Sequence, residues 1–191
     1  MLFEDYQIVL ASGSPRRAEL LRSMDISFSV LLKPVNEDYP LDLDLEKVPE
    51  FLAKKKAMAY EINQENTLLI TADTVVLLDG KILGKPENKE KAILMLKKLS
   101  EKSHEVITGV CIRSSLKEIV FCDKTTVQFS VLNSKEIEYY VKQYNPLDKA
   151  GAYGIQDWIG NIAIMSIQGS YTNVMGLPTE MLYRQLLNFI D

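Results

Sequence analysis

Short apolar or alternating runs, typical of strands, are interspersed with longer stretches whose apolar residues recur every three or four positions, as on one face of a helix. The short runs predict strands at Tyr6–Ser12, 28–32, 67–78 and 161–167, a return strand after a tight Asp79–Gly80 turn, and a long hairpin over 104–115 and 117–131. The longer period predicts helices at Pro15–Met24, Leu45–Ile62, Asn88–Leu99, Lys135–Gln143 and Leu177–Ile190. The expected cap of the fourth helix is Ser134, and Pro178 is expected to open the last.

This order of elements predicts the fold class. Helices that cross over between strands, combined with a long hairpin, are typical of an α/β protein with a mixed sheet. The 191 residues suffice for one globular domain or for two lobes that share a core. No repeat, low-complexity segment or flexible linker interrupts the sequence, so residues 1–191 are expected to form a single domain.

Composition limits the function classes. With 22 basic and 26 acidic residues the net charge is −4, which argues against a general DNA- or RNA-binding surface. No uncharged apolar run approaches the roughly 20 residues of a membrane span, and Glu4 and Asp5 stand where a signal peptide would be basic. We expect a cytoplasmic protein with Cys111 and Cys122 as reduced thiols.

The chain has a single histidine, His104, which limits the metal sites and catalytic triads that it can form. A histidine-based zinc site would need cysteine or carboxylate partners, and the sequence contains no CxxC. A Ser–His–Asp triad would have to use His104, which lies in the alternating stretch SHEVITGV. We therefore expect a structural histidine with satisfied hydrogen bonds.

The stretch LASGSPRRAELL places two charges against a helix dipole. Ser14 suits an N-cap and Pro15 the first helical position, so Arg16 and Arg17 lie in the first turn, where the dipole favours carboxylates. A strand, a small-residue turn and a helix N-terminus together form an anion site, and arginine binds phosphate bidentately. The pair therefore indicates a phosphate ligand, unless both side chains merely point into water.

A carboxylate interrupts the apolar strand TLLITADTVVLL. Burying Asp73 without a partner is costly, so it lies at a strand end, pairs with a cation or binds a metal ion, unless it only caps a turn. Lys85 in ILGKPEN follows a strand, where cleft residues of α/β folds often lie, although an ordinary loop lysine fits equally. Glu37, with Asp38 beside it, is a candidate magnesium ligand.

Three consecutive lysines occur in LAKKKAMA. The helical angle places Lys55 inside the apolar stripe, Lys56 at its flank and Lys54 on the opposite side, which is also the pattern of a solvated face with one lysine stem along the apolar surface.

The stretch DKAGAYGIQDWIG is rich in glycine, which permits close approach of the backbone to a partner. Gln156 offers both donors and acceptors, as needed to read a base edge. Tyr153 and Trp158 suit stacking on a base, although packing in the core is the commoner role of aromatic side chains.

Together these segments resemble the Maf family of nucleoside triphosphate pyrophosphatases. Seven blocks occur in the family's order and cover nearly the whole chain: LASGSPRRAELL, LAKKKA, TADTVV, ILGKPEN, HEVITGV, DKAGAYGIQ and GSYTNVMGLP. The resemblance implies a mixed twisted sheet with flanking helices and two lobes around a central cleft, as in Maf and ITPase-like proteins. It also implies hydrolysis of a nucleoside triphosphate to the monophosphate and pyrophosphate with magnesium or manganese, and it allows a homodimer.

Motif by motif, the resemblance assigns roles. Asp73 of ADT matches the family's proton acceptor and, with Glu37, its metal-binding positions. The residues that match the phosphate cluster are Arg17, Lys56 and Lys85, which favours Lys56 over Lys55. The residues that match positions linked to base choice are Arg16, Thr74 and Gln156. Ser14 and its helix N-terminus are expected to hold one phosphate group. The pattern GAYGIQ is similar to the branch that prefers dTTP and UTP.

Two positions depart from the family pattern. Asn36 stands where many members have Asp, which removes one charge from the metal site, and Asp157 follows Gln156 where glycine is common, which affects the base pocket. Two other functions stay open. One is a non-catalytic nucleotide-binding regulator of cell division. The other is a pyrophosphatase that removes modified or damaged nucleotides.

Overall fold

The computed structural model describes residues 3–190. Its strands are hydrogen-bonded in the order β2-β1-β3-β5-β6-β7, and β4 pairs with β3. Their bounds are β1 Gln7–Leu10, β2 Ser29–Val30, β3 Thr67–Leu78, β4 Lys81–Leu83, β5 Ser103–Arg113, β6 Glu118–Phe129 and β7 Ile164–Gln168. The strand β1 is parallel to β2 and β3, whereas β4 is antiparallel to β3 and β7 to β6. The predicted α/β class with a mixed sheet is therefore confirmed.

Helices lie between several of these strands and after the last one. Their bounds are α1 Pro15–Ser23, α2 Val48–Met58, α3 Lys89–Leu99, α4 Ser134–Tyr144, α5 Trp158–Ala163, α6 Tyr171–Met175 and α7 Thr179–Ile190. Short 3-10 turns occur at Leu45–Lys47, Pro146–Asp148 and Ala150–Ala152. Within the described range, no helix is both long and apolar enough to cross a membrane.

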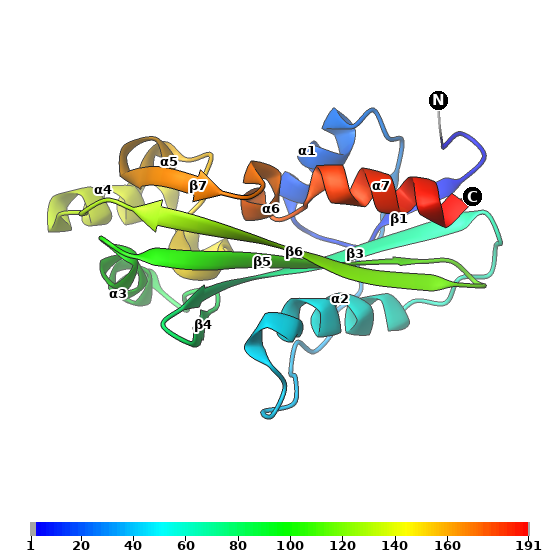
Figure 1. The fold of residues 1–191 in the computed structure, drawn as a ribbon, viewed down its shortest axis with the longest axis horizontal. Coiled ribbons are helices and arrows are strands. Elements are labelled where there is room, and N and C mark those ends of the chain that lie inside the picture. The colour runs from blue at the N-terminus through cyan, green and yellow to red at the C-terminus, as the bar shows by residue number, and fades with distance from the viewer. Residues whose placement is uncertain (1–2, 191) are drawn as a thin grey trace. The chain divides into compact units, whose positions relative to one another are not determined.

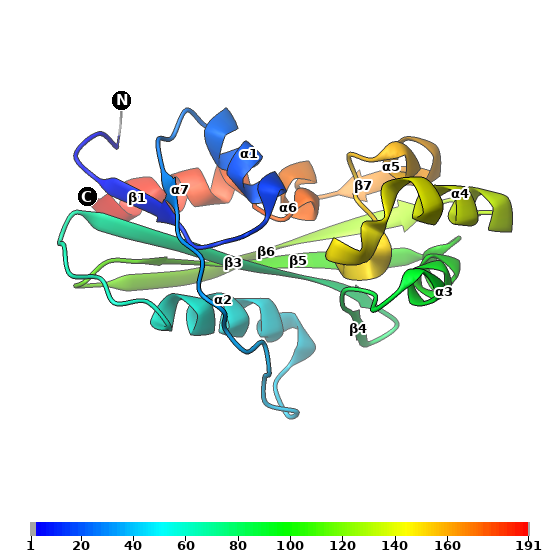
Figure 2. The same cartoon turned by 180° about the vertical axis from the view of Figure 1, so that it is seen from behind.

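The chain divides into two compact units, and the first contains residues up to Asp73, Thr108–Asp123 and the residues from Gly176 onward. Within this unit α2 covers one face of the strands, while α1 and α7 lie on the other face (Figures 1 and 2). The core beneath α2 is made by small and medium side chains, including Ala53, Ala57, Leu69 and Cys111. Cys111 and Cys122 are free thiols, as predicted, and burial raises the pKa of Cys111 to about 12.

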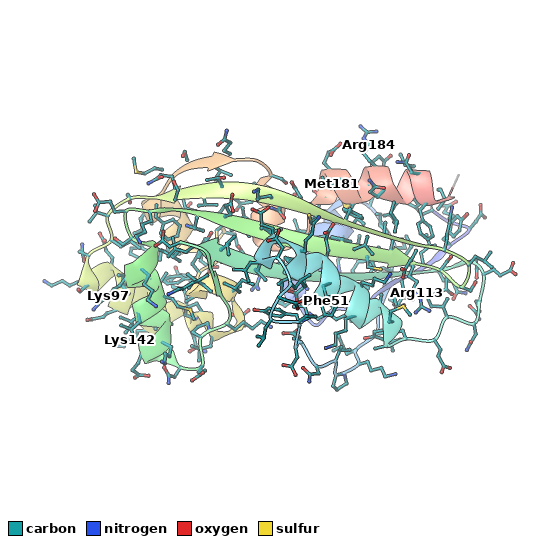
Figure 3. All side chains as sticks on the ribbon, turned by 60° about the horizontal axis from the view of Figure 1, so that its bottom comes forward. Phe51, Lys97, Arg113, Lys142, Met181 and Arg184 are labelled. Carbon is teal, nitrogen blue, oxygen red and sulfur yellow. The ribbon has the colours of Figure 1, made fainter. Side chains whose placement is uncertain are left out.

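Two contacts hold α2 against the sheet. A Cβ on Gly109 of β5 would lie 2.3 Å from the carbonyl carbon of Pro49, so only glycine allows the start of α2 to come this close. At the other end, Arg113 donates to the carbonyl oxygens of Ala57 at 3.0 Å and Tyr60 at 2.8 Å. Figure 3 shows Arg113 beside that end of α2, where a cation also suits the helix dipole.

The second unit contains Thr74–Ile107 and Lys124–Met175. Its core joins the strands to α3, α4 and α5 through buried residues that include Leu96, Phe129, Tyr140 and Ile159. The predicted turn at Asp79–Gly80 is confirmed. Both residues have positive φ, 50° and 71°, as a two-residue hairpin turn requires.

Three predicted boundaries near the chain's start and middle are wrong. The strand expected over 28–32 is limited to β2, and the helix expected over Leu45–Ile62 ends at Met58. That helix stops where side chains from outside it bond to carbonyl oxygens at its end, including Lys33 Nζ to Ala59 O at 2.6 Å. The expected cap Ser134 is the first residue of α4, and Asn133 is the cap. Asn133 and Glu136 form a reciprocal capping box, which outweighs the serine next to it.

The last third of the chain differs from prediction in two places. The expected strand 161–167 begins only at Ile164, because Asn161–Ala163 continue the helix α5 and bury Ala163 in the core. The final helix begins at Thr179, two residues after the expected start, although Pro178 still accepts its first backbone hydrogen bond, from Leu182 N at 2.8 Å.

Candidate active site

Asp73 is the buried carboxylate that the sequence singled out, and it has a cationic partner. Its residue is 8% exposed, and Lys56 Nζ on α2 lies 2.6 Å from its Oδ1. Thr71, two positions earlier on the same face of β3, donates to the carbonyl oxygen of Ala53, three positions before Lys56. Thr71 and Asp73 lie on one face of β3, so the contact of Thr71 with Ala53 places the following turn of α2, which carries Lys56, beside Asp73. Of the alternatives that the sequence left open for Asp73, the structure shows the pairing with a cation.

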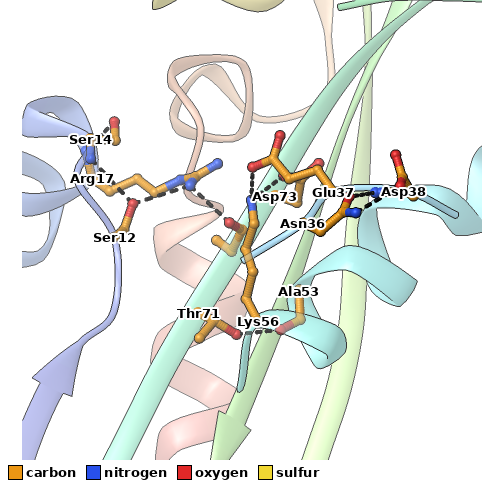
Figure 4. A network of polar contacts seen from close by, with 11 residues as sticks. Ser12, Ser14, Arg17, Asn36, Glu37, Asp38, Ala53, Lys56, Thr71 and Asp73 are labelled. Carbon is orange, nitrogen blue, oxygen red and sulfur yellow. Dashed lines mark hydrogen bonds and ion pairs between the residues drawn. The ribbon is translucent and has the colours of Figure 1, made fainter. Parts of the chain in front are cut away.

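Lys56 also joins a second carboxylate. Its Nζ lies 2.7 Å from Oε1 of Glu37, whose loop runs over residues 31–44 between β2 and the 3-10 turn (Figure 4). The loop is folded locally by Asn36, which donates to the Asp38 carboxylate at 2.7 Å and accepts from Asp38 N at 2.8 Å. Asn36, the position where an acidic charge was missing, therefore shapes the segment that carries Glu37.

The three consecutive lysines of α2 have three different partners. Lys54 pairs with Glu118 on β6, Lys55 donates to the carbonyl oxygen of Asp38 at 2.7 Å, and only Lys56 reaches Asp73. The prediction that Lys55 lies in the apolar stripe is wrong. The buried stripe continues through Leu52, so Lys56, one turn later, faces the sheet with its side chain 17% exposed.

Arg17 connects the first turn of α1 to the strand that carries Asp73. Its Nε donates to the carbonyl oxygen of Gly176 at 2.8 Å, and its Nη1 donates to Ala72 O at 2.8 Å and to Ser12 Oγ at 3.2 Å. The alternative that both arginines point into water is therefore wrong for Arg17, which is directed towards the backbone beside Asp73. Figure 4 shows its side chain crossing from α1 towards this strand.

The electrostatic environment of Arg17 is mixed. Burial lowers the pKa of its guanidinium, the charges of Asp73 and Glu37 raise it, and the neighbouring Arg16 lowers it. Arg16 is half-buried in the same helical turn. A cation that is desolvated beside a second arginine gains most from an additional anion, which is the chemistry expected of a phosphate site.

Ser14 caps α1, as predicted. Its Oγ accepts from Arg17 N at 3.5 Å, with Pro15 at the first helical position. Because a hydroxyl that accepts one hydrogen bond still carries a proton to donate, Ser14 can also bind a phosphate oxygen. Ser12, which the sequence analysis did not select, supports this turn. Its Oγ accepts from Ser14 N at 3.3 Å as well as from Arg17.

The carboxylates of Glu37 and Asp73, which share the Lys56 ammonium, are suitable ligands for a hard divalent cation. The oxygens of Glu37 and Asp73 are each within hydrogen-bond distance of Lys56 Nζ, so they are close neighbours. Magnesium is commonly held by one or two carboxylates together with substrate phosphates. Among residues 3–190, no group of three or more His, Cys, Asp or Glu forms a complete metal site. The residues therefore suit a cation that is shared with a phosphate ligand.

Three predicted site residues belong to the second unit. Thr74 directly follows Asp73 in β3 and is half-buried. Lys85 is exposed after β4 and lines a pocket of about 300 Å³ with, among others, Lys91 and Lys98. Gln156 is exposed in the turn before α5. Their meeting with the Asp73 cluster stays a prediction.

The aromatic residues considered for base stacking have other roles. Tyr153 is 6% exposed within the core of the second unit, and the ring of Trp158 packs edge-on against Tyr139. His104 is structural, as expected, but only partly satisfied. Its Nε2 is 2.7 Å from the Tyr153 hydroxyl, whereas its buried Nδ1 has no hydrogen-bond partner in the described part of the chain. Burial lowers the pKa of His104 to about 4.

The sequence is similar over nearly its whole length to a known protein family. The family model described as "Maf-like protein" matches residues 7–189. A protein of Porphyromonas gingivalis named "dTTP/UTP pyrophosphatase" is 53% identical over 188 residues, which covers 96% of this chain and 94% of that protein. A protein of the same name from Bacteroides thetaiotaomicron is 51% identical over 185 residues and covers 96% of both chains.

A solved structure supports the fold alone. The Staphylococcus aureus Ham1 protein aligns with a TM-score of 0.53 at 14% identity, covering 97% of this chain and 100% of that one. Its likeness extends over both units and therefore agrees with the α/β class predicted from the sequence.

Proposed function

Because the chain belongs to the Maf-like protein family, we propose that it is a pyrophosphatase that hydrolyses dTTP and UTP to the nucleoside monophosphate and pyrophosphate. The names of the relatives support this substrate class. The single structural observation that carries it is the ammonium of Lys56 between the carboxylates of Asp73 and Glu37, with Arg17 bound to the adjoining backbone. We treat residues 1–191 as one functional domain in this proposal.

The reaction requires a water molecule that attacks the α-phosphorus and a pyrophosphate that leaves. In our proposal Asp73 accepts the proton of that water, and the bond from the α-phosphorus to the bridging oxygen breaks. Lys56 lies 2.6 Å from Asp73 and 2.7 Å from Glu37, and in our proposal its ammonium also binds the incoming phosphates.

Positive groups stabilise the charge that develops on the phosphate oxygens. We assign this role to Arg17, Lys56 and Lys85, while Ser14 and the N-terminal amides of α1 hold one phosphate group. Glu37 and Asp73 would hold magnesium or manganese, which when bound neutralises phosphate charge. Base choice is assigned to Arg16, Thr74 and Gln156.

Isotope labelling tests the reaction directly. Purified protein is incubated with UTP or dTTP and magnesium in water enriched in oxygen-18, and the products are analysed by mass spectrometry. Attack at the α-phosphorus puts the label in the monophosphate, and attack at the β-phosphorus puts it in pyrophosphate. Nucleotide that binds but is recovered intact would contradict the proposal and favour a nucleotide-binding regulator. A panel of methylated pyrimidine nucleotides tests for a role in removing modified nucleotides.

A further inference from the structure

Gln156 lies in a tight turn that a backbone hydrogen bond closes. Gly154 O accepts from Asp157 N at 3.0 Å, which makes residues 154–157 a β-turn with Ile155 and Gln156 at its centre. Ile155 is buried at 5% exposure, whereas Gln156 is exposed. One central residue therefore anchors the turn in the core, and the other presents an amide to solvent.

Asp157 occupies the N-cap position of α5, but it does not cap that helix. Aspartate at this position normally accepts from the first amides of its own helix, and Asp157 makes no such bond. Its Oδ2 instead accepts from the Tyr140 hydroxyl of α4 at 2.7 Å, and Lys149 Nζ lies 3.9 Å away. The carboxylate therefore points back beneath the turn rather than along the helix.

The hydroxyl of Tyr140 links both ends of the turn. It accepts from Gly154 N at 3.0 Å while it donates to Asp157. Tyr140 is fully buried, and its pKa is raised by burial and by the bond to Asp157, so it stays a donor at neutral pH. A Cβ on Gly154 would lie 2.6 Å from Asp157 Oδ2, so glycine is needed there to admit the carboxylate.

The residue before the turn is held separately. Tyr153 is buried against the rings of His104 and Phe129, at centroid distances of 5.4 and 4.9 Å, and its hydroxyl meets His104 Nε2. The turn is therefore held by the bonds of Tyr140 to Gly154 and Asp157 and, before it, by the buried ring of Tyr153.

We infer that Asp157 and Tyr140 are positioning residues that fix Gln156 for discrimination between pyrimidine bases. This inference rests on the proposed function. Uracil and thymine present an N3–H donor beside an O4 acceptor, whereas cytosine presents an N3 acceptor beside an amino donor. A glutamine amide carries both a donor and an acceptor and can match either edge when it is free to move and rotate, so we take selectivity to require a turn that holds Gln156 in one position relative to the base.

The experiment compares kcat/KM for UTP with kcat/KM for CTP in four variants. Asp157→Gly and Tyr140→Phe each break the link and should lower the UTP/CTP ratio about fivefold, with kcat for UTP changed less than KM, because the base does not react. Asp157→Asn keeps an acceptor for Tyr140 and should stay within about twofold of the wild-type ratio. The double variant Asp157→Gly/Tyr140→Phe should lower the ratio no further than either single variant, because both remove the same link.

Asn133→Ala is the matched control. It destabilises α4, the helix of Tyr140, by removing its capping box without touching the turn, and it should leave the ratio unchanged. An unchanged ratio in Asp157→Gly, an equal loss in Asn133→Ala, or an equal loss in Asp157→Asn would each overturn the inference.

A readout without turnover keeps the inference separate from the proposed function. Amide hydrogen exchange over residues 150–160 should become faster in Asp157→Gly and stay at the wild-type rate in Asn133→Ala. If the wild type fails to hydrolyse UTP, the proposed function is wrong, and the exchange result still decides whether Asp157 fixes the turn. Unchanged exchange in Asp157→Gly would overturn the positioning role.

Discussion

Asp73 and Asp157 are carboxylates of similar exposure, 12% and 17% for their side chains, with different kinds of partner. Asp73 meets a lysine that is shared with Glu37, so its partner is charged and has an alternative place to bind. Asp157 also has a lysine nearby, Lys149 at 3.9 Å, which is shared with Asp148. Its short hydrogen bond of 2.7 Å, however, comes from the neutral hydroxyl of Tyr140, which is buried and bonded to the backbone of the same turn. The comparison teaches that burial alone does not distinguish a reactive carboxylate from a fixed one, whereas the partner does.

The same contrast separates the polar networks around the two residues. The cluster around Asp73 is built from full charges, Arg17, Lys56 and Glu37, which respond strongly to an incoming anion or cation. The contacts around residues 153–157 rely mainly on the neutral hydroxyl, imidazole and amide groups of Tyr140, Tyr153, His104 and Gly154, which we call the neutral network. Neutral hydrogen bonds hold geometry with little response to ionic strength, which suits recognition of a base rather than chemistry on phosphate.

Replacing Asp73 or Asp157 by asparagine is expected to give the largest difference in turnover between two matched variants. Asp73→Asn should lower turnover of UTP at least about 1000-fold, because the amide cannot accept the proton of water, and should change nucleotide affinity less than about threefold. Asp157→Asn should stay within about twofold of wild-type turnover. Pyrophosphate release and calorimetric titration measure the two quantities. Near-normal turnover in Asp73→Asn would refute its role as the base.

Two lysines of α2, Lys56 and Lys54, allow an ion pair shared by two carboxylates to be compared with an ion pair on the surface. Lys56→Met should lower kcat about 100-fold through lost charge stabilisation. Lys54→Met removes only the half-exposed pair with Glu118 and should change kcat less than twofold and leave the free energy of unfolding nearly unchanged. Steady-state kinetics and urea unfolding measure both. Equal losses of kcat in the two variants would show that helix integrity, not the Lys56 ammonium, is what matters.

The neutral network contains the buried imidazole of His104, which makes the stability of the fold depend on pH. His104 has a pKa of about 4 in the folded chain against an ordinary value of 6.5, so below pH 6.5 the unfolded state binds more protons than the folded state. Stability should therefore fall as the pH drops from 6.5 towards 4, by about 2 kcal/mol at pH 5. Urea unfolding at several pH values measures this loss. In His104→Gln the free energy of unfolding should change less with pH over this range. An unchanged pH dependence in this variant would show that other groups cause the loss of stability.

The sequence predicted the charged cluster better than the neutral network, for physical reasons. A carboxylate in an apolar strand or an arginine in a first helical turn contradicts its local environment, so Asp73 and Arg17 stand out without a structure. The choice between Lys55 and Lys56 could not be made from helical angle, because the buried stripe is set by the sheet against which α2 packs. The resemblance to the Maf family supplied that choice.

The neutral network could not be predicted because its residues fit their local sequence. Tyr140 lies in the predicted helix Lys135–Gln143 without any local conflict, and Asp157 stands out only as a departure from the family pattern, with no sign of its partner. Their bond joins α4 to a turn far along the chain, and no periodicity reports such a contact. Elsewhere most of the strands and helices were predictable, but the short helices α5 and α6 were missed. Boundaries also failed where tertiary contacts compete, as at the end of α2 and the start of β7.

The smallest expected effects come from substitutions at two helix caps, Asn133 in the second unit and Ser14 in the first. Asn133→Ala should cost about 1 kcal/mol of unfolding free energy and leave KM for UTP unchanged, because its capping box serves α4 alone. Ser14 makes a single long cap bond of 3.5 Å, so Ser14→Ala should cost less stability. It should nevertheless raise KM about threefold, because the hydroxyl also donates to phosphate in our proposal. Urea unfolding and steady-state kinetics separate the two caps. A larger stability loss in Ser14→Ala with unchanged KM would make Ser14 a cap only and remove it from the phosphate site.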